Sequence, residues 1–223
     1  MNNADDYVGN CTIVLERLMR NNVEVCLIYN YADVPFVFFE CTYRKENELC
    51  RCSLIPAAES KFNFADIYYQ NKEFEITVEY DPFGISLWLE TIYGKELLAG
   101  ENLIEIRDEK PIIGEKLRHQ LRRLRKLGAL NSFARAFRLT LTTSKEVIRA
   151  ILDILNKPEL REEIYTKIRQ KDIEMCEENN PECFYKMDEF IRDIKLIGRA
   201  ILDTNNLIRK ILRIAEEYVQ GKA

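Results

Sequence analysis

Residues 116–138 read KLRHQLRRLRKLGALNSFARAFR and separate a strand-rich half of the chain from a helix-rich half. The stretch contains eight lysine and arginine residues, no acidic residue, and His119, the only histidine of the protein. Up to residue 126 the hydrophobic residues recur with the 3.6-residue period of a helix, and every lysine and arginine lies outside their stripe. The stretch predicts a basic surface whose candidate nucleic-acid or anion-binding residues are Lys116, Arg118, His119, Arg122, Arg123, Arg125, Lys126, Arg135 and Arg138.

Charge is unevenly distributed along the 223 residues. The net charge is −4, but segment 115–138 alone carries +7, which leaves −11 for the remainder. Clustered lysine and arginine side chains neutralise phosphates and release counterions, and the nearby Phe133 and Phe137 can stack on bases. This pattern indicates an acidic protein with one concentrated basic segment, which differs from a uniformly basic nucleic-acid-binding protein.

The overall composition is that of a globular protein with a sizeable core, at 47% hydrophobic and 31% charged residues. No hydrophobic run approaches 18 residues, and the N-terminal residues MNNADDYVGNC are polar and acidic. We therefore expect a cytoplasmic protein without a membrane segment. Four glutamines and eight glycines among many charges suggest a thermophile, whereas sixteen asparagines argue against one.

The first half of the chain predicts a helix followed by two antiparallel β meanders. Residues 5–21 have helical spacing of Val8, Ile13, Leu15 and Leu18. The first meander is expected at Val23–Asn30, Phe36–Tyr43 and Leu49–Ile55. With a turn at 44–47, Cys41 lies opposite Cys50, Phe39 opposite Cys52, Val37 opposite Leu54, Glu40 opposite Arg51 and Phe38 opposite Ser53. This register places only hydrophobic side chains on one face.

The second meander is expected at Ala65–Gln70, Glu73–Tyr80 and Ile85–Thr91, with a strong turn signal in Asp81-Pro82-Phe83-Gly84. Alternation places one set of hydrophobic residues on the inner face. The outer face is acidic and includes Asp66, Glu73, Glu75, Glu79, Trp88 and Glu90, with Glu75 opposite Glu90. Leu103–Arg107 adds one further candidate strand to these six.

The second half predicts helices. The first begins near Pro111, the segment 132–141 is ambiguous, and Thr143-Ser-Lys-Glu146 is a capping box that starts a helix to about Asn156. Further helices are expected from Pro158 to about Glu178, from Asn180-Pro181 to about Asp203, and over 205–220. The predicted fold class is α+β, with a sheet domain at 1–110 and an antiparallel helical bundle at 111–223.

Seven cysteines provide candidates for disulfides. Cys41 and Cys50 are placed to form one, and Cys176 and Cys183 flank a predicted helix–helix loop. Cys50 and Cys52 stand two residues apart on a strand, about 6.5–7 Å from each other, which is too far for tetrahedral zinc. We therefore expect no metal site.

Three classes of function remain open. The amphipathic helices favour an interaction or assembly protein that binds itself or a protein partner, as a subunit of a larger, nucleic-acid-associated complex. Segment 116–138 alternatively binds DNA, RNA or another polyanion directly, or it docks on the acidic sheet face of the same chain or on another subunit. A third alternative is an enzyme that uses His119 on a small anionic substrate at the domain seam. No glycine-rich phosphate loop or nucleophile elbow occurs, so we expect no cofactor.

Overall fold

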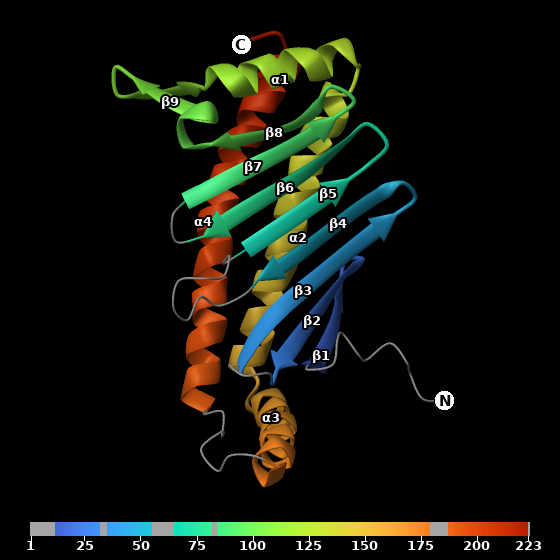
Figure 1. Cartoon of the computed structure of the whole chain (residues 1–223), viewed down its shortest axis with the longest axis vertical. Coiled ribbons are helices and arrows are strands. Elements are labelled where there is room, and N and C mark those ends of the chain that lie inside the picture. The colour runs from blue at the N-terminus through green and yellow to red at the C-terminus, as the bar shows by residue number, and fades with distance from the viewer. Residues whose placement is uncertain (1–11, 32–34, 55–64, 82–83, 179–186, 223) are drawn as a thin grey trace.

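A large antiparallel sheet dominates the computed structural model, which describes residues 12–31, 35–54, 65–81, 84–178 and 187–222. Its eight strands follow one another in chain order, so each pairs with its neighbours in sequence (Figure 1). The strands are β1 (Thr12–Arg20), β2 (Val23–Asn30), β3 (Phe36–Lys45), β4 (Glu48–Leu54), β5 (Ala65–Gln70), β6 (Phe74–Asp81), β7 (Gly84–Thr91) and β8 (Gly94–Ala99). The α+β class is confirmed, whereas the number of strands exceeds the predicted six.

The predicted N-terminal helix is wrong, because residues 12–20 form strand β1. A β-bulge between Val14 and Glu16 inserts an extra residue, which reverses the alternation of side chains beyond it. Leu15 and Leu18 therefore both face the core although they are three residues apart, a spacing typical of a helix. The turn at Asn21-Asn22, with φ of 48° and 66°, closes the β1–β2 hairpin.

The β3–β4 hairpin differs from prediction by two residues in register. Cys41 lies opposite Cys52, and Tyr43 lies opposite Cys50. The turn is shorter than expected because only residues 46 and 47 lie between the strands, with Glu46 at a φ of 50°. Because side chains alternate with a period of two, a shift of two residues leaves the same side chains on the inner face, but each residue then lies opposite a different residue of the other strand. The disulfide is therefore Cys41–Cys52 and not Cys41–Cys50.

The other predicted pairs of this hairpin shift in the same way. Phe39 lies opposite Leu54, Glu40 opposite Ser53 and Arg51 opposite Thr42. The predicted disulfide between Cys176 and Cys183 lies outside the described residues, since Cys183 falls in segment 179–186.

The second meander follows the predicted register at β6–β7. At β5–β6 the register is shifted by two residues, since Gln70 lies opposite Glu75 and not opposite Glu73. Glu75 lies opposite Glu90, and the inward residues of β5 to β7 whose burial is described are all buried except Ile85, which is half-buried. Strand β8, which was not predicted, continues the sheet. The predicted strand at 103–107 is β9 (Ile104–Arg107), which pairs with β10 (Lys110–Ile113) in a separate hairpin. Residues 110–113 are therefore a strand and not the beginning of a helix.

Four α-helices follow in the described part of the chain: α1 (Glu115–Lys126), α2 (Leu130–Asn156), α3 (Pro158–Glu178) and α4 (Met187–Val219). The predicted start of a helix at Thr143 is wrong, since α2 passes through it without a break. There Ser144 Oγ donates a hydrogen bond to the Thr140 carbonyl oxygen (2.8 Å). The hydroxyl is thus bonded to the backbone one turn earlier in the same helix and does not cap a new helix. Helix α4 likewise continues through 204–205, where a boundary was predicted.

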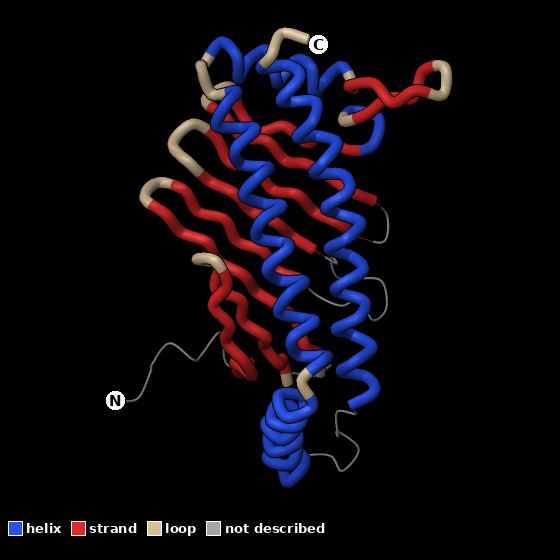
Figure 2. The backbone as a smooth tube through the Cα atoms, turned by 180° about the vertical axis from the view of Figure 1, so that it is seen from behind, coloured by secondary structure: helices blue, strands red, loops and turns tan. Residues whose placement is uncertain are grey.

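Two of the helices cover one face of the sheet. Helices α2 and α4 lie side by side behind it, while α1 crosses the end beyond β8 (Figures 1 and 2). One hydrophobic cluster contains residues from both sides of the predicted domain boundary at 110–111. No helix in the described ranges is long and apolar enough to cross a membrane.

The buried thiol Cys50 gives a test of the packing between sheet and helices. Burial raises its pKa from 9.0 to about 11, so at pH 8 about 0.1% is thiolate, against about 10% for an ordinary thiol. We expect iodoacetamide to alkylate Cys26, which is half-buried, at least tenfold faster than Cys50 in the native protein. Mass spectrometry of time points gives both rates, and urea should equalise them. Equal rates without urea would contradict this packing.

Candidate anion-binding cavity

The basic stretch is divided between two helices. Helix α1 ends in a Schellman turn, in which Gly128 has a φ of 70° and Ala129 N–H donates to the Leu124 carbonyl oxygen (2.9 Å). The chain then turns sharply into α2 at Leu130. Segment 116–138 therefore does not form one continuous basic face, and its members reach different surroundings.

A cavity of about 830 Å³ lies between α1, the β9–β10 hairpin and the C-terminal end of α4. Of the described residues that line it, five are cationic: Arg118, Arg122, Lys210, Arg213 and Lys222. Its apolar lining is formed by Ile104, Ile112, Ile113, Ile214 and Tyr218. The acidic residue of the described lining is Glu217, which accepts a hydrogen bond from Arg213 Nε (2.9 Å). The cavity therefore combines an aliphatic wall with an excess of positive charge.

Local structure explains how α4 and the turn that follows it supply three of the cations. Lys210 and Arg213 are three residues apart and share one side of the helix. After α4 ends, Gly221 adopts a φ of 69° and Lys222 N–H donates to the Glu217 carbonyl oxygen (3.0 Å). This second Schellman turn brings Lys222 back to the cavity.

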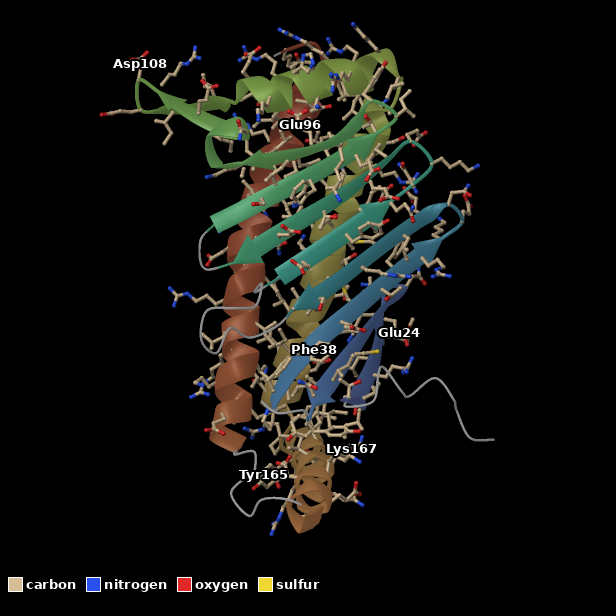
Figure 3. The ribbon with its side chains drawn as sticks, in the orientation of Figure 1. Glu24, Phe38, Glu96, Asp108, Tyr165 and Lys167 are labelled. Atoms are coloured by element: carbon tan, nitrogen blue, oxygen red, sulfur yellow. A yellow bond between two sulfur atoms is a disulfide. The ribbon has the colours of Figure 1, made fainter. Side chains whose placement is uncertain are left out.

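Helix α1 is held over this end of α4 by specific contacts. The Arg125 guanidinium lies 4.8 Å from the centre of the Tyr218 ring and also donates to the Tyr218 carbonyl oxygen. On the other side, Gln120 donates to Glu96, which lies where β8 approaches α1 (Figure 3). These contacts position Arg118 and Arg122, one helical turn apart, at the cavity.

Four other predicted anion-binding residues connect elements of the fold. Arg123 lies 5.4 Å from the centre of the Tyr93 ring, and Arg125 packs on α4 as described above. Arg135 forms an ion pair with Glu48 (2.6 Å), and Arg138 Nε donates to Glu216 (2.9 Å). Lys116, His119 and Lys126 are exposed and do not line the cavity.

The idea that Phe133 and Phe137 stack on bases is wrong. Their side chains are 0% and 1% exposed. The Phe133 ring packs edge-on against Phe74 of β6 (5.7 Å between centroids) and Phe137 (4.9 Å). Both rings belong to the core between sheet and helix, and neither is available to a ligand.

The acidic outer face of the sheet has no described contact with segment 116–138. Trp88 Nε1–H donates to Glu79 (3.0 Å), and Lys95 Nζ lies 5.1 Å from the centre of the Trp88 ring. Burial raises the pKa of the Tyr68 phenol, and the carboxylate of Glu75 raises it further. No described helix covers this face (Figure 1). The cation next to Trp88 is therefore Lys95 of strand β8 and not a residue of segment 116–138.

Sequence reasoning identified two of the five cavity cations, Arg118 and Arg122, and missed Lys210, Arg213 and Lys222. The spacing of Lys210 and Arg213 indicates only a polar helix face. That this face meets α1, about ninety residues earlier in the chain, depends on long-range packing. No group of three or more potential metal ligands occurs among the described residues.

Comparison with known proteins gives no further assignment: no protein-family model, curated protein or solved structure matches the chain.

Proposed function

We propose that this protein binds a small organic anion in the cavity between α1, β9–β10 and α4. The observation that carries the proposal is the described lining, with five cations against one carboxylate that already accepts from Arg213. Guanidinium groups form strong, charge-assisted hydrogen bonds with phosphate and carboxylate oxygens. The volume is within the range of ligand pockets, about 300–1,000 Å³.

The test is a fluorescence titration with anilinonaphthalene sulfonate, a probe that is both anionic and apolar. The double variant Arg118→Glu/Arg122→Glu should weaken binding at least about 100-fold, because each charge-assisted hydrogen bond contributes about 1.5–3 kcal/mol. Lys116→Glu/Lys126→Glu is the matched control, since it changes the net charge equally on exposed positions of the same helix. It should weaken binding less than about fivefold. Equal loss in both variants would refute the cavity as the site.

A second candidate function, self-assembly, is favoured by the position of the acidic sheet face. Glu75 lies opposite Glu90, so like charges are adjacent across the strands. A second copy that presents its cavity cations to this face would relieve the repulsion. Within one copy the two surfaces do not meet in the described part of the chain.

Trp88 can report this assembly because it is the only tryptophan. We expect light scattering to show concentration-dependent association at about 50 mM salt and monomers at about 500 mM, with a parallel shift in Trp88 emission. Glu75→Lys/Glu90→Lys should abolish the association. Glu159→Lys/Glu162→Lys, which makes the same charge change on exposed positions of α3, should retain it. A monomer at every salt concentration would exclude this function.

A further inference from the structure

The apolar lining of the cavity is aliphatic. Three of its isoleucines, Ile104, Ile112 and Ile113, come from the β9–β10 hairpin, and Ile214 comes from α4. All four are only partly buried, so each retains apolar surface that a ligand can cover. The hairpin pairs only with itself among the described strands and projects from the end of the molecule, with Asp108 at its tip (Figure 3). The sheet therefore does not fill this side of the cavity.

The lining lacks the groups that recognise a nucleotide base or a sugar. Its aromatic residue is Tyr218, whose side chain is 6% exposed and whose ring is covered by the Arg125 guanidinium. A base requires an open aromatic surface for stacking and amide or hydroxyl groups at its edge. None of the described lining residues is a serine, threonine, asparagine or glutamine. A nucleotide base or a sugar would thus meet mainly isoleucine side chains and charged groups in place of an open aromatic ring and amide groups.

The cations suit a compact anionic head group. Arg118 and Arg122 are four residues apart on α1, which places their side chains on the same side of the helix. Two guanidinium groups in this arrangement can hold the oxygens of one phosphate or carboxylate. Lys210, Arg213 and Lys222 approach from α4 and the turn that follows it. The cavity therefore has one charged end and one aliphatic end.

We infer that the ligand is an amphiphile in which an alkyl or acyl chain carries a phosphate or carboxylate head group. This inference rests on the proposed anion-binding function and specifies its ligand. The alkyl or acyl chain of the ligand lies against the isoleucines, and its head group lies among the arginines and lysines. Because burial of each methylene contributes about 0.8 kcal/mol, affinity should rise about fourfold per added methylene until the cavity is full.

The experiment is isothermal titration calorimetry of the full chain with octyl, decyl and dodecyl phosphate and with octanoate, decanoate and dodecanoate. All are used below their critical micelle concentrations, with adenosine monophosphate and inorganic phosphate for comparison. We expect affinity to rise about fifteenfold for every two methylenes in at least one series. The stronger series identifies the head group. A flat series, or adenosine monophosphate that binds as tightly as decyl phosphate, would overturn the inference.

Two variants of the protein test where the alkyl chain of the ligand binds. Ile104→Ala/Ile112→Ala should weaken dodecyl phosphate at least tenfold and leave inorganic phosphate unchanged. Ile106→Ala, on the same hairpin but 78% exposed and outside the lining, should change neither. An equal effect of both variants would also overturn the inference. Failure of the proposed function is distinct, because there no anion of any kind, the sulfonate probe included, would respond to Arg118→Glu/Arg122→Glu.

Discussion

Replacing Phe133 with alanine is expected to lower the free energy of unfolding by about 3 to 5 kcal/mol, the largest loss that we predict. The side chain is 0% exposed and connects the sheet to α2 through a series of ring contacts. Tyr69 packs on Phe74 (5.8 Å between centroids), Phe74 on Phe133 (5.7 Å), and Phe133 on Phe137 (4.9 Å). Alanine removes the middle of this series and leaves a cavity that the surrounding rings cannot fill.

Urea denaturation followed by circular dichroism measures the loss. Leu152→Ala is the matched control, because it truncates a hydrophobic side chain of the same helix that is 49% exposed. It should change the free energy of unfolding by less than about 0.5 kcal/mol, since leucine and alanine have similar helix propensities. If the two variants lose the same stability, Phe133 does not connect the two layers as described.

Tyr29→Phe is expected to lower the free energy of unfolding by about 2 to 4 kcal/mol. The Tyr29 hydroxyl donates to Asp172 Oδ1, and the two side chains are 0% and 1% exposed. Asp172 continues the buried stripe of α3 that begins with Ile164 and Ile168. Removal of the donor leaves a buried carboxylate with one hydrogen bond fewer, which is costly in a low-dielectric interior.

Calorimetric or urea unfolding measures this loss, and hydrogen exchange should show faster opening of α3. Tyr93→Phe removes a hydroxyl from a tyrosine that is 49% exposed and should cost less than about 0.5 kcal/mol. Asp172→Asn keeps an acceptor and should cost less than Tyr29→Phe. A loss of stability for Asp172→Asn, with none for Tyr29→Phe, would show that this hydrogen bond does not stabilise α3.

The hydrogen bond between Tyr29 and Asp172 also predicts how the stability of the protein changes at alkaline pH. Burial first, and then the hydrogen bond to Asp172, raise the pKa of Tyr29 above its ordinary value of 10.0. The folded chain therefore holds this proton more tightly than the unfolded chain, so its contribution is complete below pH 10 and declines as the pH rises above it. Tyr29→Phe should show a smaller loss of stability than the wild type between about pH 10 and 11.

Residue patterns predicted which side chains face the core better than they predicted the elements themselves. The alternation in 65–91 placed Ile67, Ile76 and Leu87 inside, and all three are buried. The error at β3–β4 was a shift of two residues, which preserves the face but changes the partner of Cys41. The face on which a side chain lies follows from the alternation within one strand, whereas the residue opposite it depends on the length of the turn between the strands.

Tertiary structure alone decided two features. The bulge at residues 14–16 made a strand resemble a helix, because Leu15 and Leu18 reach the same core from a three-residue spacing. The capping box Thr143-Ser-Lys-Glu146 resembles a helix start, but this part of α2 is buried, with Thr143 beside the Cys50 thiol of β4, and the helix continues. In both cases packing against distant segments outweighed a local signal.

The sequence by itself determined that segment 116–138 is basic, that its first part is an amphipathic helix, and that a sheet face of opposite charge exists. The tertiary structure decided what each basic residue does. Arg135 and Arg138 pair with carboxylates of distant segments, and Arg118 and Arg122 enter the cavity. The physical reason is that a charge is visible in the sequence, whereas its partner depends on which segments the folded core brings together.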